Sequence, residues 1–231
     1  MNPVSYIVKK YNLKIGHETS KRAVTIPNVD RNDLAKLFAE LGYKVGAEIG
    51  VQRGVYSEIL CKANPNLKLF CVDPYLAYKG YDTKQIKYDA FYKQARKRLK
   101  PFDCVFVKQF SMDAIKDFDD NSLDFVYIDG NHTLKYVVSD IVEWTRKVRH
   151  GGIVSGHDYI RRAHFPRKVN SFTGKFRRSN ATHHVPEAVN AYMASYYINP
   201  WFIFGRRARI PGEIRDSDRS WMFVKESFYY E

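Results

Sequence analysis

The stretch 48–56, E-I-G-V-Q-R-G-V-Y, decides the fold of this chain. Residues 44–49 are typical of a buried strand, Gly50 and Gly54 bracket a tight turn, and 57–63 has the pattern of a helix. Glycine is favoured where a backbone passes so close to a ligand that a side chain would block the approach. A strand, a glycine turn and a helix in this order indicate a unit of an α/β sheet that binds a ligand at its strand ends.

Two acidic residues flank this unit. Asp73, in F-C-V-D-P-Y, ends the apolar run 67–72, where a carboxylate can bind two ribose hydroxyls. Glu48 opens the turn, and its carboxylate would repel a pyrophosphate but suits a ligand with an ammonium group. The spacing acid-x-G-x-x-x-G also lacks the middle glycine of the dinucleotide fingerprint G-x-G-x-x-G. We therefore expect S-adenosylmethionine, which has an amino acid end, a sulfonium and a ribose, as the cofactor.

Composition indicates one domain spanning 1–231. The chain has 231 residues, of which 45% are apolar, as is ordinary for a globular protein. No window approaches the about 20 apolar residues of a membrane span, and the N-terminus lacks the layout of a secretion signal. The three cysteines have no C-x-x-C spacing, which favours small core residues in a reducing compartment. The expected location is the cytoplasm.

The pattern along the chain predicts an α/β fold with a doubly wound, mostly parallel, seven-stranded Rossmann-like sheet and an antiparallel C-terminal edge. Strands are expected at 45–49, 67–72, 103–107, 123–128, 151–155, 201–207 and 220–225. Helices are expected at 30–42, 57–63, 84–98, 112–117, 133–148 and 185–197. The domain then divides into an N-terminal arm and helix (1–43), a cofactor-binding core (44–160), a basic loop (161–184) and a C-terminal helix with strands (185–231).

Charge is less ordinary than composition. Lysine and arginine number 38 against 25 acids, a net charge of +13. The cations of 93–100 are typical of an exposed helix face, whereas the run 161–178 follows directly on a strand end. A basic loop at the mouth of a site suits an anionic substrate such as a phosphorylated sugar, a nucleotide or a nucleic acid. Charge alone does not choose among these.

Polar residues end two further strands. In Y-I-D-G-N-H at 127–132 the strand ends in Asp129, and His132 opens the next helix. In G-G-I-V-S-G-H-D-Y at 151–159 the strand ends in His157 and Asp158. Chemistry in such sheets takes place beyond the carboxyl ends of the strands, so these residues lie beside the glycine turn if the strands are neighbours.

Two interpretations of these residues remain open. Asp129, His157 and Asp158 could bind Mg²⁺ or another divalent cation, which would hold a substrate's hydroxyls. Alternatively, Asp129 caps the following helix while His157 and Asp158 form structural hydrogen bonds. His132 could act as the base that removes a hydroxyl proton, because histidine titrates near neutral pH, or it could cap the helix that follows it.

Taken together, these motifs resemble those of class I S-adenosylmethionine-dependent methyltransferases, and most closely the small O-methyltransferases with Y-I-D-G-x-H and G-G-x-x-x-x-H-D-Y signatures. The resemblance covers about 45–160 well. It implies that Glu48, Gly50 and Gly54 wrap the methionine end, with Ser57 at the start of the following helix. It also implies that Asp73 holds the ribose.

The same resemblance implies that Ser111 and Met112 contact the adenine, and that Asp129 lines the methyl-transfer site. Macrocin-type and catechol-type members bind a divalent metal at positions that match Asp129 and the pair His157–Asp158, although a histidine here replaces the first acid of the pair. In the catechol-type enzymes a lysine three residues after the first ligand takes the substrate proton, and this sequence has His132 there. The expected catalytic residues are thus His132 and Asp129.

The expected function is methylation of a small, hydroxylated or anionic acceptor such as a sugar, a glycan or a natural product. The alternative is an RNA or nucleotide methyltransferase, suggested by the basic surface with interleaved aromatic residues. The N-P-P-Y-type loop of base amino-group methylation is absent after 129. A third class, a cofactor-binding scaffold without activity, would need a blocked crevice, which the polar strand ends argue against. Neither the acceptor nor the oligomeric state is specified by the sequence.

Overall fold

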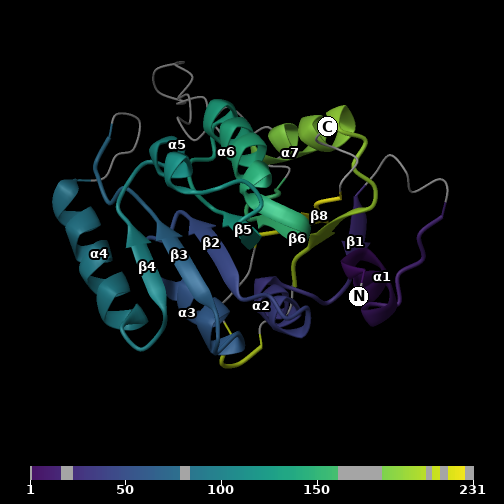
Figure 1. Ribbon diagram of the computed structural model, residues 1–231, viewed down its shortest axis with the longest axis horizontal. Helices are drawn as coiled ribbons and strands as arrows, with labels where there is room; N and C mark the ends of the chain where they lie inside the picture. Colours follow the sequence, from purple (N-terminus) through teal and green to yellow (C-terminus); the bar gives the residue numbers. More distant parts are fainter. Residues whose placement is uncertain are drawn as a thin grey trace, which may run out of the picture.

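The computed structural model describes residues 2–16, 23–78, 84–160, 184–206, 210–213 and 218–226. Its centre is one eight-stranded sheet in the order β1-β7-β8-β6-β5-β2-β3-β4 (Figure 1). The strands are β1 Val24–Ile26, β2 Val45–Ile49, β3 Lys68–Val72, β4 Cys104–Val107, β5 Leu123–Ile128, β6 Val148–Gly156, β7 Trp201–Phe204 and β8 Ser220–Val224. The helices are α1 Pro3–Lys10, α2 Arg31–Glu40, α3 Val55–Ala63, α4 Gln85–Leu99, α5 Ser111–Ala114, the 3-10 turn Ile115–Asp117, α6 Leu134–Lys147 and α7 Val185–Ser195.

The predicted fold class is confirmed. Strand β8 runs antiparallel to both β6 and β7, and every other strand pair in the sheet is parallel. The C-terminal pair β7–β8 therefore forms the expected antiparallel part of the sheet. The sheet has eight strands rather than seven, because β1 pairs in parallel with β7 and lies outside it.

The N-terminal segment differs from the expected arm. It contains the helix α1 as well as β1. Asn2 caps α1 by accepting a hydrogen bond from the Ser5 amide, and Ile7 is the fully buried residue of that helix. A strand of three residues is too short to show an alternating pattern, and its pairing with β7 is a contact between distant parts of the chain. Neither feature leaves a local periodic signal that sequence analysis could use.

Helices cover both faces of the sheet, as expected for a doubly wound fold. Helices α1 to α4 pack on one face around a core that includes Phe38, Leu60 and Phe125. Helices α5 to α7 pack on the other face around Trp144, Ile141 and Val189. Figure 1 shows α4 at the β4 end of the sheet and α1 at the β1 end. Among the described residues, no helix is long and apolar enough to cross a membrane.

The sheet order places at β2 the switch point beside which doubly wound sheets form their ligand-binding crevice. This strand has β3 on one side and β5 on the other, so the chain reverses its direction of winding there. Loops that leave β2 and β5 diverge to opposite faces, and ligands bind at such switch points. The basic loop expected at 161–184 falls outside the described residues, apart from His184.

Candidate active site

The ends of four neighbouring strands are held in one row. The amide N–H of Asp73, Gly50, Asp129 and His157 each donates to the last carbonyl of the adjacent strand, at 3.2, 2.9, 2.8 and 3.0 Å respectively. These bonds continue the parallel ladders one residue past β3, β2, β5 and β6. As a result, the glycine turn, Asp73 and the two polar strand ends lie side by side, as the sequence predicted on the condition that the strands are adjacent.

The glycines of the turn are required for a different reason from the expected one. Gly50 has φ +93°, and a Cβ there would lie 2.2 Å from the carbonyl oxygen of Asp129. Gly54 has φ +70°, and a Cβ there would lie 3.1 Å from Leu99 of α4. In both cases the crowding comes from the protein itself, so these glycines let β2 approach β5 and let α3 approach α4. Their predicted contact with the cofactor stays a prediction.

Asp73 is held by two backbone amides. Gln52 N–H donates to one carboxylate oxygen at 2.9 Å, and Tyr75 N–H donates to the other at 2.8 Å. Burial raises the pKa of Asp73, and these amide hydrogen bonds oppose that shift. Both donors have positive φ, 49° and 48°, in a region that side-chain-bearing residues rarely adopt. Such strained backbone is characteristic of functional sites.

Glu48 is buried, with 2% of its surface exposed. Ser57, from the first turn of α3, donates a short hydrogen bond to its carboxylate. Burial raises the pKa of Glu48 to about 8, although the hydrogen bond from Ser57 lowers it; the nearby Asp129 charge raises it further. Glu48 is therefore mostly protonated at pH 7. Ser57 itself is fully buried and orients this carboxyl group.

Four side chains at the ends of β5 and β6, Asp129, His132, His157 and Asp158, form what we call the strand-end cluster. His132 Nε2 lies 3.3 Å from Asp129 Oδ1 and 3.1 Å from Asp158 Oδ2. His157 Nδ1 lies 3.4 Å from Asp158 Oδ1 and 4.0 Å from Asp129 Oδ2. The side chains of Asp129 and His132 are 24% and 23% exposed, so a small molecule can reach them.

The charges of the cluster act on His132. Burial alone would lower its pKa, but the hydrogen bond with Asp129 and the charges of Asp158 and Asp129 outweigh that effect, so the pKa of His132 is raised. The two carboxylates thus stabilise the protonated ring, which makes neutral His132 a stronger proton acceptor than an isolated histidine.

One ligand atom each from Asp129, His132 and Asp158 lies within 4.8 Å of the other two, close enough to bind one metal ion. The sequence had proposed Asp129, His157 and Asp158 as ligands. The structure brings His132 into this group and leaves His157 beside it, in contact with both acids. Two carboxylates and an imidazole fit a divalent ion such as Mn²⁺ or Zn²⁺, and fit Mg²⁺ less well because Mg²⁺ prefers oxygen ligands.

The expected adenine contacts lie on α5. Ser111 Oγ donates to Asp140 Oδ1 at 2.5 Å and accepts from Trp144 Nε1 at 2.7 Å, so its hydroxyl is bound to α6. Met112 packs partly buried against the core on that face. Burial raises the pKa of Asp140 to about 7, an effect that the hydrogen bond from Ser111 reduces.

Sequence reasoning missed two charged residues near the site. Asp140 shares the apolar face of α6 with Val137, Ile141 and Trp144, all buried, and an acid on such a face is a signal that could have identified it. Arg31, the first residue of α2, lies with Nη1 3.8 Å from Asp129 Oδ2. No local motif marks Arg31, because packing of α2 against α3 brings it to the crevice.

Comparison with known proteins adds to this geometry. Residues 47–159 match the family model described as "Methyltransferase domain", a segment that contains both the glycine turn and the strand-end cluster. No curated protein sequence matches the chain.

Two solved structures illustrate the likeness in fold. The O-methyltransferase TomG from Streptomyces achromogenes, involved in tomaymycin synthesis and solved with S-adenosylmethionine (SAM), is 15% identical with a TM-score of 0.54, covering 97% of this chain and 96% of that one. An O-methyltransferase from Bacillus cereus, solved with SAH (S-adenosylhomocysteine, the cofactor after loss of its methyl group), is 12% identical with a TM-score of 0.54, covering 96% of this chain and 89% of that one. At these identities the likeness shows a shared fold.

Proposed function

We propose that this chain, a SAM-dependent methyltransferase, transfers a methyl group to a hydroxyl oxygen of a small acceptor. The observation that carries the proposal is the strand-end cluster, in which His132 lies between two carboxylates next to the glycine turn. A hydroxyl is a weak nucleophile until its proton is removed, so its methylation needs a proton acceptor. The domain match supports the cofactor, and the two O-methyltransferase neighbours support oxygen as the methylated atom.

The cofactor side of the proposal rests on the two flanking acids. SAM supplies the methyl group when bound. The Glu48 carboxyl group would ionise to face the ammonium of its methionine end, and Asp73 would accept hydrogen bonds from the ribose hydroxyls. Residues Ser111 and Met112, at the start of α5, would line the adenine. Gly50 and Gly54 would leave the backbone of the turn open toward the methionine end.

On the acceptor side, His132 takes the hydroxyl proton and Asp129 stabilises the imidazolium that results. Asp158 contributes a second negative charge within 3.1 Å of the same nitrogen. These two acids explain why the pKa of His132 is raised despite its burial. Positioning of the acceptor oxygen against the methyl group would supply much of the rate.

A divalent cation is a further part of the proposal. Asp129, His132 and Asp158 would hold it, with His157 as an additional donor at the same place. Such an ion would lower the pKa of an acceptor hydroxyl and fix vicinal hydroxyls. In that case His132 would serve as a ligand, and the acidified hydroxyl would need no separate strong base.

The test is methyl transfer from SAM to a panel of sugars, phenols, nucleotides and short RNAs, with SAH release as the signal. Each acceptor is assayed with EDTA, with Mg²⁺ and with Mn²⁺, and the product's methylated atom is assigned by NMR. We expect an O-methylated small molecule. Methylation of nitrogen or carbon, or no SAH release from protein that binds SAH, would overturn the proposal.

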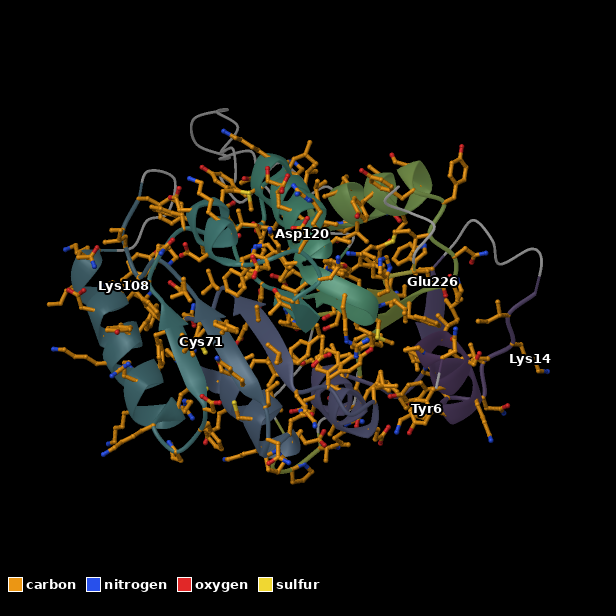
Figure 2. The ribbon with its side chains drawn as sticks, in the orientation of Figure 1. Tyr6, Lys14, Cys71, Lys108, Asp120 and Glu226 are labelled. Atoms are coloured by element: carbon orange, nitrogen blue, oxygen red, sulfur yellow. The ribbon has the colours of Figure 1, made fainter. Side chains whose placement is uncertain are left out.

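A second candidate function, methylation of RNA, is favoured by the outer surface of α4. Exposed cations on or next to this helix are Lys84, Lys87, Lys93, Arg96, Lys97 and Lys100. Within the described part of the chain, no ion pair neutralises any of them, whereas Arg98 pairs with Glu58 at 2.6 Å. Figure 2 shows Lys108 at this same end of the molecule, where its amine lies 5.2 Å from the Tyr92 ring centre.

This candidate has a separate test. If RNA is the substrate, binding must weaken steeply as salt rises, because lysine and arginine displace condensed counterions from the phosphates. Replacing Lys93 and Lys97 together with glutamine would then reduce both RNA affinity and the salt slope. Methylation of a small acceptor that is unchanged by this double substitution would favour the first proposal.

A further inference from the structure

We infer that Arg31 binds the α-carboxylate of the cofactor's methionine end. The inference rests on the proposed function, since it assigns a further binding residue to the same site. The main observation is the position of the Arg31 guanidinium, between the glycine turn and the end of β5. Neither the motifs of the sequence nor the domain match marks this residue.

Two contacts with α3 hold Arg31 at the turn. Its carbon lies 5.3 Å from the ring centre of Tyr56, the second residue of α3 and so two residues past Gly54. The hydroxyl of Tyr56 donates to the backbone oxygen of Arg31 at 2.9 Å. The backbone and the side chain of Arg31 are thus both held by the helix that follows the glycine turn.

The start of α2 is braced as well. Asp30 caps this helix with a reciprocal pair of bonds involving Asp33, and its carboxylate lies 3.4 Å from Arg206 Nη1. Asn32 is buried and donates to the Asp30 carboxylate. Arg31 therefore projects from a rigid backbone, which is the condition for precise ligand contact.

The charges around Arg31 match the two ends of an amino acid. Glu48, whose pKa the Arg31 charge lowers, is the expected partner of the ammonium. An amino acid tail that places its ammonium at Glu48 must place its carboxylate within a few ångströms, and a cation is needed there. Arginine suits this role because its planar fork of N–H donors matches a carboxylate with two parallel hydrogen bonds.

The side chain of Arg31 is 17% exposed, so a ligand can approach it, and its Nη1 lies 3.8 Å from Asp129 Oδ2. The structural alternative is that Arg31 only balances the charge of Asp129. The two roles differ in one respect: only carboxylate binding depends on whether the ligand has a carboxylate.

The experiment uses that difference. Binding of SAH and of its decarboxylated analogue, which keeps the amine, is measured by calorimetry for wild type, Arg31→Gln and Arg31→Lys. We expect wild type to favour SAH by roughly tenfold or more, and Arg31→Gln to lose this preference while its affinity for the analogue changes little. Arg31→Lys should retain part of the preference. Arg149→Gln is the matched control and should behave as wild type, because Arg149 likewise lies 5.3 Å from a tyrosine ring and pairs with an aspartate, Asp124, at the start of β5.

The outcomes separate the two proposals. If wild type binds neither ligand, the proposed function fails and the inference fails with it. If SAH binds but Arg31→Gln keeps the preference, or loses affinity for both ligands equally, the proposed function stands and Arg31 has only a structural or charge-balancing role. Should Arg31→Gln fold poorly by circular dichroism, Arg31→Lys takes its place: a preference for SAH smaller than that of wild type supports the inference, and an unchanged preference overturns it.

Discussion

Acids on the β2–β3 side of the crevice are hydrogen-bonded by their own neighbours, whereas those at the ends of β5 and β6 face one another. Asp73 accepts hydrogen bonds from two backbone amides, and Glu48 accepts one from the Ser57 hydroxyl. Asp129 and Asp158 instead lie around two imidazoles: His132 is 3.3 and 3.1 Å from them, and His157 is 4.0 and 3.4 Å from them. The cofactor side is thus already ordered, while the acceptor side keeps two like charges together around two proton-binding rings.

This difference shows where the protein retains unfavourable electrostatics. Two carboxylates held close together raise the energy of the folded chain unless a proton, a cation or a ligand balances them. A site of this kind can be made more stable by removing a charge, at the expense of activity. On the β2–β3 side, by contrast, removing a hydrogen-bond donor to Asp73 or Glu48 can only lower the stability of the folded chain. The following predictions test that contrast.

The largest expected effect is on catalysis, from Asp158→Asn. Asp158 has φ +57°, and asparagine tolerates this conformation as well as aspartate does. Loss of one charge beside His132 should reduce methyl transfer by roughly 10²- to 10⁴-fold, as removal of acid–base assistance does. Because a like charge is removed, the free energy of unfolding in urea should stay level or rise.

The control for that prediction is Asp113→Asn, which alters an exposed acid of α5 whose side chain is 62% accessible. It should leave SAH release unchanged. Asp158→Asn with activity within a few-fold of wild type would show that the strand-end cluster has no part in the reaction. A clear loss of stability would instead give Asp158 a structural role.

The next largest effect is on stability, from Gly50→Ala. The added methyl would meet the Asp129 carbonyl at 2.2 Å in a left-handed backbone conformation, so we expect a cost of roughly 3 kcal/mol or more. Gly42→Ala is the matched control, because Gly42 has φ +73° with no atom within 4 Å of the new Cβ. It should cost about 1 kcal/mol. Equal costs in urea unfolding would contradict the close approach of β2 to β5.

A smaller effect concerns the pH dependence of stability. Burial raises the pKa of Asp140 to about 7, from an ordinary value of 3.8. The folded chain keeps this proton between about pH 4 and pH 7, where the unfolded chain has lost it, so the free energy of unfolding falls as pH rises through that window. In Asp140→Asn that decline should be shallower, by roughly 1–3 kcal/mol between pH 5 and pH 8.

If the free energy of unfolding falls by the same amount between pH 5 and pH 8 in wild type and in Asp140→Asn, Asp140 is already ionised in the folded protein. Glu48 contributes a decline of the same sign, because burial raises its pKa as well. Comparison of the two proteins, rather than either curve alone, isolates the contribution of Asp140.

Local sequence patterns predicted much of the fold. The grouping of the candidate site residues was predicted from the geometry of a parallel sheet. The strand, turn and helix around Gly50 have strong local signals, and parallel strands bring Asp129 and Asp158 to one edge wherever they are neighbours. That inference needed no knowledge of side-chain contacts. His132 was singled out for its position after the strand, and the structure places it between the two acids.

The features that were not predicted depend on contacts between distant segments. Strand β1 is defined by pairing with β7, almost 180 residues later in the sequence. Arg31 reaches the crevice because α2 packs against α3, and the role of Gly54 depends on α4. Such features have no periodic or compositional signature, so a single sequence does not specify them.

The most direct test of the account is titration of SAH into the protein at pH 7, in two buffers with different ionisation enthalpies. Glu48 has a pKa of about 8 and must ionise to face an ammonium group, so binding should release close to one proton. Glu48→Gln should bind more weakly and release none. Failure of folded wild-type protein to bind SAH, or binding with a proton balance that Glu48→Gln leaves unchanged, would contradict the assignment of the glycine turn as the cofactor site.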